Sequence, residues 1–241
     1  MERLGEWATQ RRRLNRLRGT PAAELTTNHI DSLELLDLVR ARTGEPGVIY
    51  DIGANVGTWT LLVKSIFPDA TVHAFEPLEK HAVKFKQVTS GLSNVHLHSV
   101  ALGAQRHEAV IHQTDFSDAS SLLPLAALGS AQWHIREVGT VGIQVVALDE
   151  WIVANGLPQP ELIKLDVQGY ELEVLRGSPS ALGKASAVIA EISFDEMYDG
   201  QCLAHDVSIY LDRAGFKLLS MSLSTPLGTR LVQTDALFMR S

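Results

Sequence analysis

Two glycines and two polar side chains follow an apolar run in the stretch from residue 48 to 60, in the order Asp51, Gly53, Asn55 and Gly57. Glycine lacks the Cβ atom that would keep a ligand away from the backbone, and it tolerates a positive φ. The amide groups of such a turn, next to a helix N-terminus, favour an anionic or polar cofactor group. A two-glycine turn alone is equally consistent with a purely structural strand-to-helix connection.

A further carboxylate, Glu76, follows the next strand-like run, residues 71–75, and precedes Pro77. It lies roughly 20 residues beyond the glycine turn, a spacing at which an acidic residue binds the paired hydroxyls of a cofactor ribose. The alternative is a charge at a helix N-terminus, where Glu and Pro are both favoured. Because the spacing and the turn agree, we favour ribose binding and expect a nucleoside-cofactor site.

The segments around these residues alternate between strand and helix. A parallel sheet with helices on both faces is therefore expected, with the ligand outside the carboxyl ends of the strands. The last two strands are close enough in sequence to pair antiparallel at the sheet's edge. The predicted strands cover residues 48–52, 71–75, 95–100, 162–166, 187–192, 216–223 and 235–239.

Residues 1–45 are expected to form an N-terminal helical segment, and residues 46–241 the main domain. A helix over about 30–43 is predicted to cover the sheet and to close one side of the cofactor site. For the basic start of the chain, a solvated helix face is favoured over a contact with nucleic acid or an acidic surface. The arginines concerned are Arg11, Arg12, Arg13, Arg16 and Arg18, and the apolar residues that could anchor this segment are Trp7, Leu14 and Leu17.

Residues 104–150 break the alternation and contain two strand-like runs, 109–112 and 142–147. A long segment of this kind inside a domain is typical of a lid or substrate loop. Its polar residues could contact a polar substrate or could form a solvated turn. They are Asp115, Asp118, Ser120 and Ser121.

The totals are those of an ordinary globular protein: 241 residues, 45% of them hydrophobic and 20% charged. The net charge of −7 argues against broad binding to nucleic acid. The single cysteine, Cys202, fits a reducing compartment. No apolar run approaches the roughly 20 residues of a membrane helix, and no secretory signal is evident. We expect a cytoplasmic protein without a membrane partner, and a homodimer is conceivable.

Three motifs together identify a resemblance. Asp-Ile-Gly-Ala-Asn-Val-Gly at residues 51–57, Phe-Glu-Pro at 75–77 and Lys-Leu-Asp-Val-Gln-Gly-Tyr-Glu at 164–171 resemble the FkbM family of S-adenosylmethionine-dependent methyltransferases. The resemblance covers roughly residues 46–240. It implies a class I methyltransferase fold, which is α/β and Rossmann-like, with a seven-stranded, mostly parallel sheet whose last strand is antiparallel. Asn55 replaces the middle glycine of the superfamily's turn, a form common in FkbM-like sequences.

The resemblance also implies roles for residues of the turn and strand ends. Gly53, Asn55 and Gly57 would surround the methionine part of S-adenosylmethionine, and Asp51 would orient that loop or meet the cofactor ammonium through water. Glu76 would bind the ribose hydroxyls. Ser99 to Ala101 would lie near the adenine, and Asp166 beside the position of methyl transfer.

Methyl transfer to a hydroxyl requires orientation of the acceptor and removal of its proton. Asp166 is the first candidate for this base, and capping of the next helix or contact with the cofactor amine is an equal alternative. Glu191 is the second, unless it is a structural carboxylate paired with Lys164. His205 titrates near working pH, although a lone loop histidine is more often solvated. A divalent metal held by Asp166, Glu191 and His205 is possible but not indicated, because their spacing is no recognised metal signature.

The leading hypothesis is O-methylation of a hydroxyl on a small molecule or a sugar, as in the tailoring of natural products or polysaccharides. A nicotinamide-dependent oxidoreductase is the alternative enzyme class, because it uses the same glycine turn and ribose carboxylate. A cofactor-binding protein without catalytic activity is a third possibility, since fold alone does not decide function.

Overall fold

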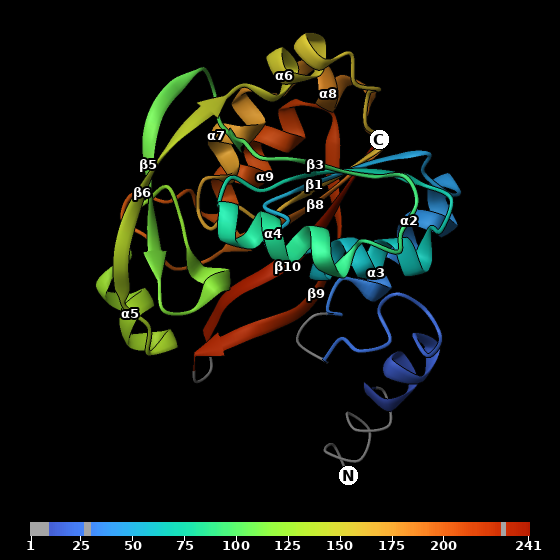
Figure 1. Cartoon of the computed structure of the whole chain (residues 1–241), viewed down its shortest axis with the longest axis horizontal. Helices are drawn as coiled ribbons and strands as arrows, with labels where there is room; N and C mark the ends of the chain where they lie inside the picture. Colours follow the sequence, from blue (N-terminus) through green and yellow to red (C-terminus); the bar gives the residue numbers. More distant parts are fainter. Residues whose placement is uncertain (1–9, 27–29, 228–229) are drawn as a thin grey trace.

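The computed structural model describes residues 10–26, 30–227 and 230–241. Within these residues a sheet of seven strands has the order β3-β2-β1-β7-β8-β10-β9 (Figure 1). Neighbouring strands are parallel except for β10, which runs antiparallel to both β8 and β9. The predicted mostly parallel sheet is confirmed. The strands are β1 Val48–Ile52, β2 Thr71–Phe75, β3 Val95–His98, β7 Leu162–Leu165, β8 Ala187–Ser193, β9 Phe216–Leu227 and β10 Arg230–Arg240.

Helices cover both faces of this sheet (Figure 1). One face carries α2 Leu33–Thr43, α3 Thr58–Ile66 and α4 Glu79–Val88, and the other carries α6 Leu148–Asn155, α7 Glu171–Arg176, α8 Pro179–Lys184 and α9 Ala204–Arg213. In the part of the chain that the structure describes, no helix is both long enough and apolar enough to cross a membrane.

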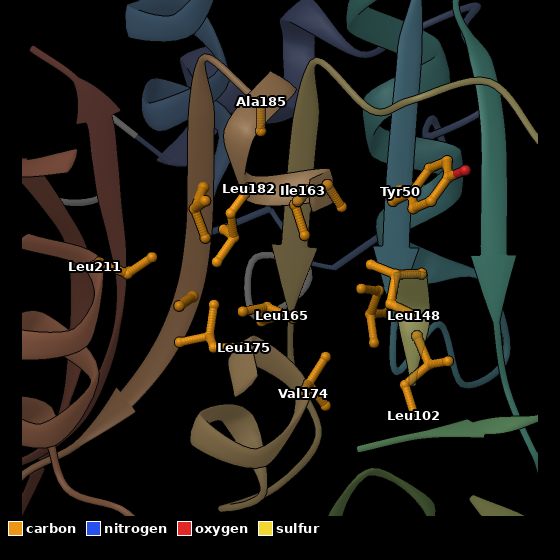
Figure 2. Packing of buried hydrophobic residues seen from close by; sticks show 14 of the residues in the cluster. Tyr50, Leu102, Leu148, Ile163, Leu165, Val174, Leu175, Leu182, Ala185 and Leu211 are labelled. Atoms are coloured by element: carbon orange, nitrogen blue, oxygen red, sulfur yellow. The ribbon is translucent and has the colours of Figure 1, made fainter. Parts of the chain in front are cut away.

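The two faces of the sheet receive alternate residues of each strand, because successive side chains of a strand point to opposite sides. On β7, Ile163 and Leu165 pack with the apolar side chains of α6 to α9, as Figure 2 shows. Leu162 instead packs in the cluster under α2 and α3. The central strands are therefore buried on both faces, which explains their nearly continuous apolar sequences.

The same alternation places charges at the carboxyl ends of the strands, on the α2 face. Lys164 and Asp166 follow Leu162 on the same side of β7, and Asp235 of β10 is the register partner of Glu191 of β8. Asp166 just after β7, Glu191 near the end of β8 and Asp235 in the middle of the antiparallel β10 thus lie in one row beside one buried lysine.

The insert, residues 104–150, folds mainly beside the main sheet. The strand predicted over 95–100 ends at His98, and β4 Ala101–Leu102 pairs with β6 Glu137–Val146, which also pairs with β5 His107–Thr114. Gly103 lets the chain leave the main sheet close to β6, because a Cβ atom at this position would lie 2.7 Å from Val145 Cγ1. The insert also contains the short helical segments η2 Ser117–Ala119 and α5 Ala127–Trp133.

The N-terminal segment is more tightly attached than the charge pattern predicts. Leu17 is 1% exposed in the cluster under α2 and α3, and Leu14 packs against the same cluster, whereas Trp7 lies outside the described residues. Arg11, Arg12 and Arg18 are exposed as predicted, but the prediction of a solvated side chain is wrong for Arg13, which is 6% exposed. The reason is Glu34 of α2, whose carboxylate forms an ion pair with the Arg13 guanidinium.

A chain of ring hydrogen bonds joins α6 to the edge of the sheet. Trp151 Nε1 donates to His98 Nδ1 at 3.3 Å, and His98 Nε2 lies 3.0 Å from His73 Nδ1. Because an indole only donates, His98 Nδ1 must accept, so the His98 proton lies on Nε2 and is donated to His73 Nδ1. Burial, and then the neighbouring His98, lower the pKa of His73 to about 4.

We predict that this histidine chain makes folding sensitive to acid. Below the ordinary histidine pKa of about 6.5, residue 73 binds a proton in the unfolded chain but not in the folded one. The free energy of unfolding therefore decreases as the pH falls toward about 4. The full shift corresponds to about 3 kcal/mol. Solvent screening reduces the expected loss across this window to about 2 kcal/mol. Urea unfolding at several pH values should show a smaller loss for His73→Phe, and an unchanged loss for His107→Phe, which alters an exposed histidine. Equal acid sensitivity of the parent and His73→Phe would contradict the assignment.

Candidate functional site

A cavity of about 300 Å³ lies at the carboxyl ends of the central strands. Its wall is formed by the turn after β1, the segment after β2, the start of β4, the loop after β7 and parts of the insert. Asp31 and Ser32 at the start of α2, and Asp235 of β10, complete it. No residue from Leu33 to Thr43 lines the cavity, so closure of the cofactor site by this helix stays a prediction.

The glycine turn after β1 depends on three residues with a positive φ: Gly53 at 84°, Asn55 at 47° and Gly57 at 92°. A Cβ atom on Gly53 would lie 1.8 Å from the Asp166 carbonyl oxygen, so only glycine lets β1 and β7 approach here. The left-handed conformation also explains Asn55, because asparagine visits it more readily than other residues with a side chain. The turn is thus fixed locally, by residue type.

Glu76 is 5% exposed and holds the turn against the following helix. Its Oε2 accepts a hydrogen bond from the Asn55 backbone N–H at 3.0 Å, and its Oε1 accepts one from Leu78 N–H at 2.8 Å. His81 Nδ1 lies 3.4 Å from Oε1. A carboxylate has about four acceptor positions, so these contacts leave Glu76 able to accept from a ligand hydroxyl in the cavity that it lines.

Asp51 is 2% exposed at the base of the cavity. The Thr60 hydroxyl of α3 donates a hydrogen bond of 2.5 Å to Asp51 Oδ2. Burial raises the pKa of Asp51 to about 6, although the Thr60 hydrogen bond and Lys164 oppose that rise. The residue ties β1 to the first turn of α3 and so fixes the direction of the glycine turn.

Lys164 lies at the end of the cavity opposite the glycine turn and is surrounded there by carboxylates. Its Nζ atom lies 3.1 Å from Asp166 Oδ2 and 3.3 Å from Asp235 Oδ1, and its side chain is 3% exposed. Burial by itself lowers the pKa of Lys164, but Asp166, Asp235 and Glu191 more than reverse this and raise it. The lysine therefore stays charged, and its charge is matched by these carboxylates.

The Gln168 side chain joins the two candidate carboxylates. Its Nε2 donates to Asp166 Oδ1 and to Glu191 Oε2, both at 2.8 Å, while its Oε1 lies 2.7 Å from the Tyr198 hydroxyl. Burial, and then the charge of Asp166, raise the pKa of Glu191 well above its ordinary value. Asp166 and Glu191 are thus two carboxyl groups in one hydrogen-bonded unit, one of them poised to hold a proton.

The insert contributes directly to the cavity. Asp118, Ser120 and Ser121 line it. Asn55 Nδ2 donates to Asp118 Oδ1 at 2.9 Å, and the Ser121 hydroxyl donates to the Gln168 carbonyl oxygen at 2.6 Å. These contacts attach the insert to both ends of the site. Asp115 does not line the cavity and pairs with Arg136 instead.

Most of the site residues expected from the sequence meet at this cavity. Asp51, Gly53, Asn55, Glu76, Ala101, Asp166 and Glu191 line it. Gly57 does not, and forms the N-cap of α3. His205 is 68% exposed on α9 beside Asp206 and lies away from the cavity, so it is not brought together with Asp166 and Glu191. Among the described residues, no group of three or more His, Cys, Asp or Glu side chains is placed to hold a metal ion.

Sequence reasoning missed several residues of the site. Gln168 lies inside the motif between Asp166 and Gly169, so its position was a usable signal. Asp31 and Asp235 belong to no motif and reach the cavity only through tertiary packing.

We predict that Gly53→Ala strongly destabilises the fold at the site. The new methyl group would overlap the Asp166 carbonyl, and alanine would also be strained at this positive φ. The expected loss is about 2–4 kcal/mol in the free energy of unfolding, measured by urea denaturation. Gly47→Ala is the matched control, because its Cβ would meet nothing closer than 3.4 Å, and it should cost less than about 1 kcal/mol. Equal stability of the two variants would refute the close approach.

Comparison with known proteins gives a family for the chain. The model of the methyltransferase FkbM domain matches residues 51–218. The 2-O-methyltransferase NoeI of Sinorhizobium fredii is 30% identical over 162 residues, which cover 64% of this chain and 66% of that protein. The hexuronic acid methyltransferase AglP of Haloferax volcanii is 30% identical over 159 residues, or 66% of this chain and 61% of that protein. The matched part thus spans less than two thirds of either relative.

The fold is also that of solved methyltransferases. Magnesium protoporphyrin IX methyltransferase of Synechocystis, solved with bound S-adenosylmethionine, superposes with a TM-score of 0.52 at 13% identity, covering 89% of this chain and 80% of that one. This likeness confirms the expected class I methyltransferase architecture.

Proposed function

The chain belongs to the FkbM methyltransferase family, and on this premise we propose that it transfers a methyl group from S-adenosylmethionine to a hydroxyl group of a small molecule or a sugar. One observation carries the proposal: the glycine turn, Glu76 and the Asp166–Glu191 unit all face a single cavity. The family match favours this activity over the nicotinamide-dependent alternative.

The residues present fit the cofactor. S-adenosylmethionine carries a net positive charge at neutral pH, and the cavity is rich in carboxylates, including Asp51, Glu76 and Asp166. Trp59 also lines the cavity, and its buried Nε1 has no hydrogen-bond partner among the described residues. A polar group of a bound molecule could satisfy that donor.

Each part of the cavity suits one part of the cofactor. Glu76 would accept hydrogen bonds from the two ribose hydroxyls, and the turn from Gly53 to Gly57 would surround the methionine part. Asp51 orients that turn through Thr60. Val100, Ala101 and Leu102 supply an apolar wall for the adenine. We propose that the insert, residues 104–150, closes over the bound molecules.

The Asp166–Glu191 unit is the proposed acid–base group. When bound, S-adenosylmethionine supplies the methyl group as an already activated electrophile. The chain must orient the acceptor hydroxyl and take its proton. Asp166 is half-buried at the cavity, so it can accept a hydrogen bond from the hydroxyl, take its proton as the oxygen–methyl bond forms, and release that proton to solvent. Gln168 and Lys164 hold the Asp166 carboxylate in place for this step. His205 lies outside the cavity and has no place in this mechanism.

A sugar acceptor is favoured by the relatives. One is named for 2-O-methylation and the other for methylation of a hexuronic acid. The proposed acceptor for this chain is accordingly a hydroxyl of a sugar or of a comparable polyhydroxyl compound.

We predict that Glu76→Ala abolishes most cofactor affinity. Calorimetric titration should show micromolar binding of S-adenosylmethionine and S-adenosylhomocysteine to the parent chain, weakened about tenfold or more in the variant, because charge-assisted hydrogen bonds to the ribose are lost. Glu79→Ala, three residues further along at the start of α4, is the control and should bind as the parent does.

NAD(H) should be titrated in parallel. Binding of NAD(H) without binding of the sulfur cofactors would overturn the proposed function. Binding of S-adenosylmethionine without turnover of any acceptor would favour the non-catalytic alternative.

We predict that Asp166→Asn separates binding from catalysis. With any acceptor that the parent chain methylates, kcat should fall about 100-fold or more, the usual range for loss of a general base. Lys164 keeps Asp235 as a partner, so the dissociation constant for S-adenosylmethionine should change by less than about threefold. Formation of S-adenosylhomocysteine measures the rate, with Asp199→Asn at an exposed position as the control. An unchanged kcat would remove Asp166 from the mechanism.

A further inference from the structure

The end of the cavity beyond Asp166 is formed largely by residues outside the span matched by the family model. Asp31 and Ser32 precede that span, and Ser222, Gln233 and Asp235 follow it. In the proposed function this end faces the acceptor, since the glycine turn and Glu76 occupy the other. Acceptor selection can therefore differ in this chain from other members of the family.

The positive charge of Lys164, the lysine at this end, is already balanced by neighbouring carboxylates, so it is not available to pair with an anionic ligand. Lys164 is held between Asp166 and Asp235, and Asp235 Oδ2 also accepts a 2.5 Å hydrogen bond from the Ser32 hydroxyl. Both partners of the lysine are anionic. The group as a whole carries net negative charge, even when Glu191 holds a proton.

Asp31 adds a further negative charge. Its Oδ1 lies 3.7 Å from Arg13 Nη1, but that guanidinium is directed mainly to Glu34, to which it donates from Nε at 2.6 Å and from Nη2. Burial raises the pKa of Asp31 to about 6; the charge of Arg13 opposes that rise, and the charges of Asp235 and Glu34 add to it. At about pH 8 Asp31 is ionised.

The lining of the whole cavity carries a net negative charge. Of the described residues that line it, seven are Asp or Glu, one is Lys164 and one is a histidine, His81, which lies beside Glu76. An acceptor that carries a carboxylate or a phosphate would bring another anion into this surface and would find no unmatched lysine or arginine in the described lining. An uncharged hydroxyl, by contrast, can donate to Asp31 or Asp235, each of which has acceptor positions left.

We propose that the acceptor end selects an uncharged polyhydroxyl compound, a neutral sugar rather than a uronate or a sugar phosphate, with Asp31 and Asp235 accepting hydrogen bonds from its hydroxyls. The inference rests on the proposed function. It separates this chain from the relative named for hexuronic acid methylation. Selection of this kind uses repulsion of the wrong ligand as well as attraction of the right one.

Matched pairs of glycosides test the proposal. The methyl α-glycosides of glucose, galactose and mannose differ from the corresponding methyl glycuronides mainly by the carboxylate at C6. Saturation-transfer NMR on the full chain with saturating S-adenosylhomocysteine, at about pH 8, should show binding of at least one neutral glycoside and at least tenfold weaker binding of its uronate. Raising the salt to about 0.5 M should narrow that difference, because screening weakens the repulsion.

Two variants assign the effect to Asp31. Asp31→Asn keeps an acceptor oxygen and leaves Arg13 paired with Glu34, and it should improve uronate binding at least threefold relative to the parent. Asp37→Asn is the matched control: it also removes a carboxylate paired with an arginine of the N-terminal segment, Arg16, but Asp37 does not line the cavity. Asp37→Asn should leave the ratio of uronate affinity to neutral-glycoside affinity unchanged.

The outcomes are distinct from those for the proposed function. Uronate binding equal to or tighter than neutral binding overturns the inference, as does equal behaviour of the two variants, or no binding by any sugar. Titration of S-adenosylmethionine into the same samples reports on the function itself. Cofactor binding together with a preference for uronates would contradict only the inference about the acceptor. Absence of cofactor binding would contradict the proposed function.

Discussion

A buried ammonium group organises this molecule. Lys164 lies at the end of a central strand with its side chain 3% exposed, where an unpaired charge would cost several kcal/mol. Asp166 and Asp235 match it, and Glu191 lies in the same row across the sheet. Removal of one partner would leave the lysine paired with the other, whereas removal of both would leave a buried charge unmatched. The position of β10, which carries Asp235 to the lysine, therefore contributes to the charge balance of the site.

That constraint connects parts of the chain that are distant in sequence. Asp235 reaches Lys164 from β10 and receives a hydrogen bond from Ser32 at the start of α2, 203 residues earlier. The N-terminal segment is in turn held by the pairing of Arg13 with Glu34. The end of the cavity that contains the glycine turn and Glu76 is thus built from local motifs, and the opposite end from contacts between the chain's two terminal regions.

The local motifs are the part that sequence reasoning could reach. Gly53, Asn55 and Gly57 are positions where the backbone requires a positive φ, and such residue types are visible without a structure. Glu76 was found by its spacing. It accepts a hydrogen bond from the Leu78 amide at the start of the next helix and also lines the cavity, so its position is compatible with both roles considered for it, of which ribose binding is a proposal. The spacing predicted position, but it could not decide between two compatible roles.

The sequence by itself determined the alternation of strands and helices, the glycine turn and the carboxylates at strand ends, because each depends on residues close together in the chain. Only the tertiary structure decided which of them meet. It brought Glu191, near the end of β8, to Asp166, just after β7, through Gln168, and it left His205 of α9 in solvent. It also placed Asp31 in the cavity. Such encounters depend on strand order and on the path of the termini, which no short motif encodes.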